Sequence, residues 1–164
     1  MPVAFRRAEV DDWPLIWPIF AEIVRAGDTY AYDPATTSDE AASLWLERAP
    51  SQTWVALVDG ELLGTYKTGP NRPGPGAHVA TASYMVAASA RGQGIGRAMV
   101  EHSLAQARHA GFRGLQFNAV VASNVHAVKL YQELGFDIVG RVPEAFRHPQ
   151  QGYVDLLVMY ADLS

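Results

Sequence analysis

The turn over residues 91–97, Arg-Gly-Gln-Gly-Ile-Gly-Arg, has a composition that suits anion binding. Gly92, Gly94 and Gly96 permit positive φ angles and carry no Cβ that would keep a ligand away from the main chain. The pattern after the turn predicts a helix over residues 95–109, whose first N–H groups lack partners within the helix and carry partial positive charge. These residues therefore favour a bound phosphate or pyrophosphate.

Two other glycine motifs fit this turn less well. A P-loop needs Lys followed by Ser or Thr, which is missing here, and the glycine spacing is not that of a dinucleotide-binding fingerprint at the start of a βαβ unit. A turn selected only for tightness stays open as an alternative.

Two segments resemble signatures of the GNAT superfamily of N-acetyltransferases. Residues 91–96 resemble the Arg/Gln-x-x-Gly-x-Gly/Ala turn on which these enzymes hold the pyrophosphate of acetyl-CoA. Residues 122–136, ASNVHAVKLYQELGF, are similar to the second signature, an Asn followed by a helix that closes with Leu-Gly-Phe. The resemblance covers nearly the whole chain. It is closest to the phosphinothricin branch and to the azetidine-carboxylate and proline-analogue branch.

The resemblance implies that acetyl-CoA binds between two central strands. In the family, the strand before the glycine turn leaves main-chain groups free to pair with the pantetheine amides like an added strand. The N–H groups of the turn hold the pyrophosphate, and nearby arginines add positive charge. Asn124 matches an asparagine near the cofactor arm, although an N-cap can be its sole role. The implied acetyl-CoA residues are Tyr84, Met85, Val86, Arg91, Gly92, Gln93, Gly94, Ile95, Gly96, Arg97, Asn124 and Ala127.

The same resemblance implies a catalytic role for Tyr131, which matches a tyrosine beside the CoA sulfur in many relatives. A phenol there can protonate the departing thiolate, a general-acid step typically worth 10²–10⁴-fold. A thiol of pKa near 8.5 already leaves fairly well, so we expect the lower end of that range. A tyrosine at the edge of the core is the alternative, because Val125, Val128 and Leu134 share its helical spacing.

The general base is harder to assign. Many relatives carry a Glu in the strand before the glycine turn, whereas the strand over residues 78–86 has none. His78 is its only side chain that titrates near neutral pH, although it opens the strand. In the azetidine-carboxylate branch, asparagines position the substrate. Asn118 matches one of them and Thr81 stands where we expect the other.

The acceptor pocket of the family implies two walls here, the loop over residues 27–34 and the segment over residues 143–155. We expect Tyr30, Tyr32, Thr81, Phe146 and Arg147 to face the acceptor. Aromatic loops favour a closed pocket for a small amine or amino acid. A solvated role for Arg147 stays open.

Local patterns predict the elements that position these residues. Strands are expected over residues 3–8, on both sides of Asp59-Gly60, over 78–86 and 114–121, and in two final segments, 136–142 and 153–163. Helices are expected over 13–26, from Ser38, over 95–109 and after Ser123 or Asn124. The strand–helix–strand unit over 78–121 has the length of a right-handed parallel crossover.

The expected fold is thus α/β (α+β), the GNAT acyl-CoA N-acyltransferase fold. It has a mixed, mostly antiparallel sheet of about seven strands that is splayed at its central parallel pair and has helices on both faces.

Composition limits the class of protein. The chain has 164 residues, a formal charge of −4 and no cysteine, so one domain over residues 1–164 is expected, without thiolate zinc sites. The histidines lack metal-ligand spacing, no stretch is apolar enough for a membrane span or a signal peptide, and the surface is poorly suited to nucleic acid. We predict a cytoplasmic homodimer that binds no metal.

The predicted function is transfer of an acetyl group from acetyl-CoA to the amine of a small molecule, such as an amino acid or its analogue. The attack is direct, through a ternary complex. Two alternatives stay open: an acyl-CoA-binding sensor without catalysis, and a protein or peptide N-acetyltransferase.

Overall fold

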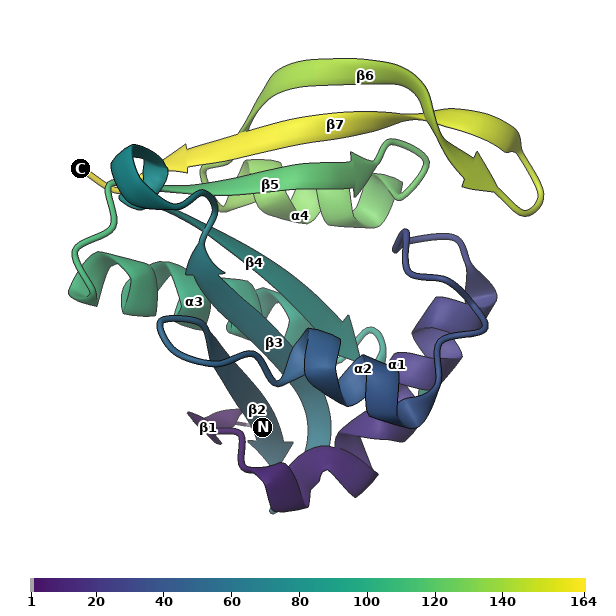
Figure 1. Ribbon diagram of the computed structural model, residues 1–164, viewed down its shortest axis with the longest axis vertical. Helices are drawn as coiled ribbons and strands as arrows, with labels where there is room; N and C mark the ends of the chain where they lie inside the picture. The colour runs from purple at the N-terminus through teal and green to yellow at the C-terminus, as the bar shows by residue number, and fades with distance from the viewer. Residues whose placement is uncertain (1) are drawn as a thin grey trace.

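A seven-stranded sheet forms the centre of the computed structural model, which describes residues 2–164 (Figure 1). The strand order is β1-β2-β3-β4-β5-β7-β6, and every neighbouring pair is antiparallel except β4 and β5. The strands are β1 (Ala4–Arg7), β2 (Gln52–Val58), β3 (Glu61–Pro70), β4 (Val79–Val86), β5 (Gly114–Val121), β6 (Asp137–His148) and β7 (Gly152–Asp162).

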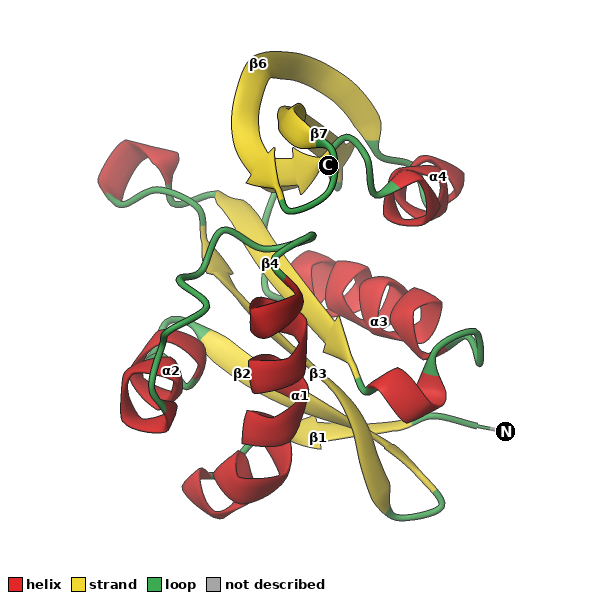
Figure 2. Cartoon of the chain, turned by 90° about the vertical axis from the view of Figure 1, so that its right-hand side faces the viewer, coloured by secondary structure: helices red, strands yellow, loops and turns green. Residues whose placement is uncertain are grey.

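Four α-helices cover the sheet on both faces (Figure 2). They are α1 (Trp13–Ala26), α2 (Ser38–Trp45), α3 (Ile95–His109) and α4 (Val125–Glu133). Helices α1 and α2 pack on the face of β2 and β4 that carries Val55 and Met85. Helix α3 packs on the opposite face.

The central parallel pair separates almost at once. Strands β4 and β5 are paired only where Val79 lies opposite Gly114 and Ala80 opposite Leu115, and the later residues of the two strands diverge (Figure 1). The predicted fold is confirmed in its strand number, its mostly antiparallel pairing and its splayed parallel pair.

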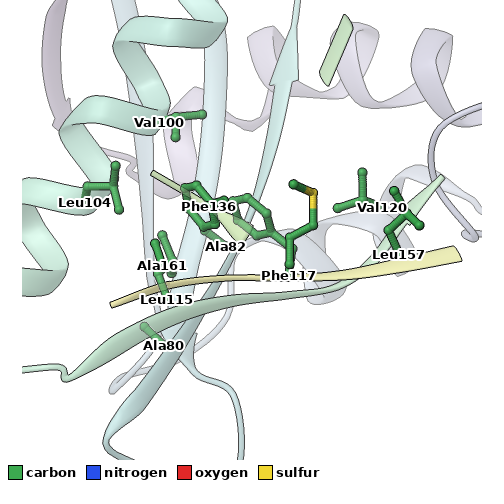
Figure 3. Packing of buried hydrophobic residues seen from close by; sticks show 11 residues of the cluster. Ala80, Ala82, Val100, Leu104, Leu115, Phe117, Val120, Phe136, Leu157 and Ala161 are labelled. Atoms are coloured by element: carbon green, nitrogen blue, oxygen red, sulfur yellow. The ribbon is translucent and has the colours of Figure 1, made fainter. Parts of the chain in front are cut away.

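The largest buried cluster holds the splayed pair together at its closed end. Ala80 and Ala82 of β4 and Leu115 and Phe117 of β5 pack there against α3 and β7 (Figure 3). The rings of Phe117 and Phe136 stack with centroids 4.4 Å apart. Burial of apolar area thus fixes the angle at which the two strands part.

Local signals set most element ends as predicted. Asp59 and Gly60 both have positive φ, 51° and 80°, as a two-residue hairpin turn requires. Gly27 ends α1 in the left-handed conformation. Asn124 caps α4 by accepting a hydrogen bond from the N–H of Ala127 at 3.4 Å.

The segment over residues 143–155 differs from the prediction, whereas α2 begins at Ser38 as expected. Strand β6 extends to His148, so most of the expected loop is strand, because pairing with β7 resumes at Phe146 after a register shift. Helix α2 stops at Trp45, and Thr37 is its N-cap, in a capping box with Glu40.

Candidate active site

A cavity of about 720 Å³ occupies the gap between the diverging strands β4 and β5. Its walls come from both strands, from the loop between α1 and α2, from the start of α3 and from α4. Thirteen of the predicted site residues line it: Tyr30, Tyr32, Thr81, Tyr84, Met85, Val86, Arg91, Gly96, Phe146, Asn118, Asn124, Ala127 and Tyr131.

The glycine turn forms one end of this cavity, where Arg91 and Gly96 contribute to the lining. Gly92 and Gly94 have φ values of 78° and 80°, and a Cβ at either would meet no heavy atom within 4 Å. The first helical hydrogen bond of α3 runs from the N–H of Ala98 to the carbonyl of Gly94. Among residues 2–164, the N–H groups of Ile95, Gly96 and Arg97 therefore have no main-chain acceptor.

The arginines of the turn have different surroundings. Within residues 2–164, Arg91 forms no ion pair and lines the cavity. Arg97 is bound to Glu133 of α4 and lies 3.7 Å from Glu101 of α3, and it does not line the cavity. The structure therefore favours Arg91 over Arg97 as the cation for an anionic ligand.

The open edge of β4 is defined by the direction of its peptide groups. The carbonyl of Val79 and the N–H of Ala87 bond to the β3 side, at Asn71 and Leu63. Peptide groups alternate sides along a strand, so those of Tyr84 and Val86 face the splay. Accordingly, the Tyr84 N–H and carbonyl both bond to the hydroxyl of Tyr30, at 2.9 and 2.6 Å.

This alternation corrects the prediction for Met85. Its main chain faces β3, opposite Thr65, and its side chain is buried against α1 and α2. Met85 thus lines the cavity, but its main-chain groups are paired with β3 and are not free for a ligand.

Tyr131 projects from α4 beside the opening. Its ring lies 4.5 Å from that of Phe117 and 6.4 Å from that of Tyr84, centroid to centroid. Its hydroxyl makes no hydrogen bond within residues 2–164. Burial raises the pKa of Tyr131 to about 12, so the phenol stays protonated at neutral pH and can donate.

Asn118 is the polar residue that β5 contributes to the cavity wall, and two neighbouring polar side chains hold its amide. The Nδ2 of Asn118 donates to the Oδ1 of Asn71 at 2.6 Å, and its Oδ1 accepts from Gln116 at 3.0 Å. Asn118 lies in a β-bulge, because pairing with β7 passes from Phe117 directly to Val120. The bulge turns its amide away from the ladder, and Thr81 lines the cavity nearby on β4.

Two predicted residues lie elsewhere. His78 is exposed at the closed end of the strand pair, where its carbonyl accepts from the N–H of Arg113 at 2.9 Å, so it is not placed to act as a base. Arg147 is exposed on β6 and does not line the cavity, whereas Phe146 points inward because strand side chains alternate.

The outer residues of the turn lie beyond the cavity wall. Gly92, Gln93, Gly94 and Ile95 do not line the cavity, and Ile95 is buried in the core.

Several further polar residues of the site were not predicted individually, although Asp28 lies in the loop that was expected to form a wall. Asp28 and His126 line the cavity, and Asn71 reaches Asn118 from the loop after β3. Asp28 directly follows the glycine that closes α1, and His126 lies in the second signature, so both stood next to signals that were recognised. Nothing local indicated that Asn71 would reach β5.

No cluster of three metal-ligating side chains occurs within residues 2–164. In the same part of the chain, no helix is both long and apolar enough to cross a membrane.

Comparison with known families agrees with this geometry. The sequence profile of the Acetyltransferase (GNAT) family matches residues 13–136. This range includes Tyr131 and the anion cradle, by which we mean the glycine turn over residues 91–97 with the free N–H groups at the start of α3. The chain belongs to the GNAT acetyltransferase family. The prediction of an acetyl-CoA-dependent N-acetyltransferase is thereby confirmed.

The chain is similar to other members of this family. A GCN5-related N-acetyltransferase from Kribbella flavida, whose structure is known, is 55% identical in sequence to this chain. The match covers 98% of this chain and 97% of the Kribbella chain, and the two structures superpose with a TM-score of 0.94. An L-methionine sulfoximine/L-methionine sulfone acetyltransferase from Pseudomonas aeruginosa is 30% identical over 150 residues, which cover 88% of this chain and 86% of the relative. A phosphinothricin acetyltransferase from Sinorhizobium meliloti, solved with AcCoA, is 22% identical and shares the fold, with coverage of 100% and 90% and a TM-score of 0.88.

Proposed function

We propose that this GNAT enzyme transfers an acetyl group from acetyl-CoA to the amine of a small molecule, such as an amino acid or its analogue, in a ternary complex. The observation that carries the proposal is the continuity of one cavity. It joins the glycine turn at Arg91 and Gly96, the open edge of β4 and Tyr131 to the aromatic loop of Tyr30 and Tyr32.

The residues present suit acetyl-CoA. The free N–H groups at the start of α3 and the unpaired Arg91 suit a pyrophosphate, and the outward peptide groups of Tyr84 and Val86 suit the amides of the pantetheine arm. Asn124 and Ala127, which line the cavity on α4, would lie on the other side of that arm.

The reaction balances as a direct displacement. The neutral amine attacks the thioester carbonyl carbon, a C–N bond forms, the C–S bond breaks and CoA leaves as a thiolate. Tyr131 donates its phenolic proton to that sulfur and regains one from solvent. The proton lost by the amine goes to a base or to water.

The base must come from groups that face the cavity. Apart from tyrosines, the lining residues whose side chains carry a carboxylate or an imidazole are Asp28 and His126. We propose these two, in place of His78, as the candidates, with water as the carrier where the side chain does not touch the amine.

We infer the chemical class of the acceptor from the side chains that line the cavity. The amide of Asn118, which Asn71 holds by a hydrogen bond, and the hydroxyl of Thr81 present polar groups to the cavity, while Tyr32 and Phe146 supply apolar surface. Such a site, with both polar and apolar walls, suits an amino acid or its analogue better than an extended peptide. The Pseudomonas relative, which is named for two amino-acid analogues, supports this class.

A test is to incubate the enzyme with acetyl-CoA and panels of amino acids, imino acids, amines and peptides, and to measure free thiol. We expect CoA release well above the hydrolysis background with at least one small amine. Acetyl-CoA binding without release from any acceptor would indicate a sensor, and release with peptides alone would indicate a protein acetyltransferase.

We also propose a cytoplasmic homodimer that pairs through β6. Strand β6 is one of the two edge strands of the sheet and exposes Ile138, Val139 and Val142, with fractional exposures of 41%, 61% and 47%. An exposed apolar edge strand favours pairing with another chain. Sedimentation velocity should show a dimer that Val139→Lys converts to a monomer, and a monomeric native protein would contradict the proposal.

A further inference from the structure

The hydroxyl of Tyr30 occupies the open edge of β4. It donates to the Tyr84 carbonyl at 2.6 Å and accepts from the Tyr84 N–H at 2.9 Å, so one phenol satisfies both polar groups of this residue. These are the two groups that an added strand would use at this position. A pantetheine amide therefore competes with Tyr30 for the same hydrogen bonds.

The loop that carries Tyr30 is held at few points. The ring of Tyr30 stacks on Tyr32 at 6.0 Å between centroids, and Tyr32 packs on Phe20 of α1 at 5.2 Å. The hydroxyl of Tyr32 makes no hydrogen bond within residues 2–164. The contact with Tyr84 is thus the polar attachment of this part of the loop to β4.

Tyr30 is suited to be a temporary partner. Burial, and then the proximity of Tyr131, raises the pKa of the Tyr30 phenol well above its usual value, so the group is neutral and can both donate and accept. A buried peptide group without partners is costly, and Tyr30 removes that cost while no ligand pairs with β4.

We propose that Tyr30 stands in for the pantetheine arm and is displaced when acyl-CoA binds. The inference rests on the proposed function, because it assumes that the arm pairs with β4. Displacement moves the loop that carries Tyr32, so the acceptor wall takes its final shape only after acyl-CoA has bound. Breaking the contact between Tyr30 and Tyr84 costs free energy, and this cost lowers the apparent affinity for acyl-CoA.

The test compares Tyr30→Phe with Tyr32→Phe by calorimetry with acetyl-CoA. Both changes keep the ring and remove one hydroxyl, but only that of Tyr30 bonds to β4. We expect Tyr30→Phe to bind acetyl-CoA about tenfold more tightly than the native enzyme, equivalent to about 1.4 kcal/mol. Tyr32→Phe should bind within about twofold of the native affinity.

Two results would overturn the displacement while leaving the acetyltransferase in place. One is unchanged or weaker binding by Tyr30→Phe when the native enzyme binds acetyl-CoA. The other comes from hydrogen exchange of the native enzyme, which does not depend on whether a variant folds. We expect acetyl-CoA to speed exchange in residues 28–34 and to slow it in residues 82–87. Slower exchange in both segments would mean that Tyr30 remains bound to Tyr84. Failure of the native enzyme to bind acetyl-CoA would overturn both proposals.

Discussion

At the scale of single residues, the site depends on which polar groups already have partners. Tyr131 has a hydroxyl without one, Arg91 has no ion pair, and Arg97 is held between two carboxylates, all within residues 2–164. Side chains of the same type in one signature are therefore expected to differ in their contribution to binding and catalysis.

Tyr131→Phe should lower kcat by about 10² and leave KM for acetyl-CoA nearly unchanged, since the lost proton donor acts on the leaving group. The melting temperature should stay the same, because the hydroxyl holds no structural hydrogen bond in the described chain. A pKa of about 12 also predicts that this residue causes no loss of rate up to pH 9. Steady-state kinetics checks all three, and an unaltered kcat would exclude the general-acid role.

Arg91→Ala should weaken acetyl-CoA by about tenfold, because it removes an unpaired cation beside the turn. Arg97→Ala should weaken it by less than about threefold, since that guanidinium is already engaged by Glu133 and Glu101. Calorimetry on both variants, with Arg91→Lys as a charge-preserving control, measures the difference. Equal losses would show that Arg97 leaves its carboxylates for the ligand.

At the scale of elements, helix α3 connects the anion cradle to the core. Ile95, Met99 and Val100 are buried along one side, so the axis of the helix, and with it the direction of its first N–H groups, is fixed by packing. The turn itself depends on the left-handed conformation of Gly92 and Gly94.

Gly94→Val should weaken acetyl-CoA by at least tenfold. The backbone at φ 80° disfavours a β-branched residue, and its side chain would project into the open space over the first turn of α3. Gly111→Val is the matched control, because Gly111 has φ 85° and equally open surroundings at the other end of the helix. Both variants should lose similar stability, but only Gly94→Val should change the dissociation constant; equal affinities would argue against the cradle.

At the scale of the whole molecule, His102 links α3 to the first strands of the sheet. Its Nδ1 lies 2.7 Å from the hydroxyl of Tyr66 on β3, and its ring stacks on Phe5 of β1 at 4.1 Å. Burial lowers the pKa of His102 below its usual 6.5, so the folded protein favours the neutral imidazole.

Stability should therefore fall in mildly acidic solution. Because the folded pKa is depressed, the unfolded chain binds the proton more readily, and the contribution of His102 is complete above pH 6.5 and is lost progressively below it. Urea unfolding at pH 7.5 and 5.5 should show a smaller drop for His102→Phe than for the native protein. An equal drop in the two proteins would assign the pH dependence to other groups.

Much of the fold could be predicted from the sequence because its signals are local. The Asp59-Gly60 hairpin, the glycine that ends α1 and the Asn124 cap act over a few residues, where backbone geometry and one hydrogen bond decide the conformation. The spacing of glycines and the helix after them indicated the cradle for the same reason, and the two family signatures added the acetyltransferase.

Only the tertiary structure decided which groups reach the site. His78 and Arg147 lie outside the cavity because of strand length and because alternate residues of a strand face opposite sides. The contact of Asn71 with Asn118 joins residues that are 47 positions apart. The contact of Tyr30 with Tyr84 spans 54 positions. No local propensity encodes such pairs, because burial of the cores on the two sides of the sheet sets the angle between β4 and β5, and that angle determines what faces the gap.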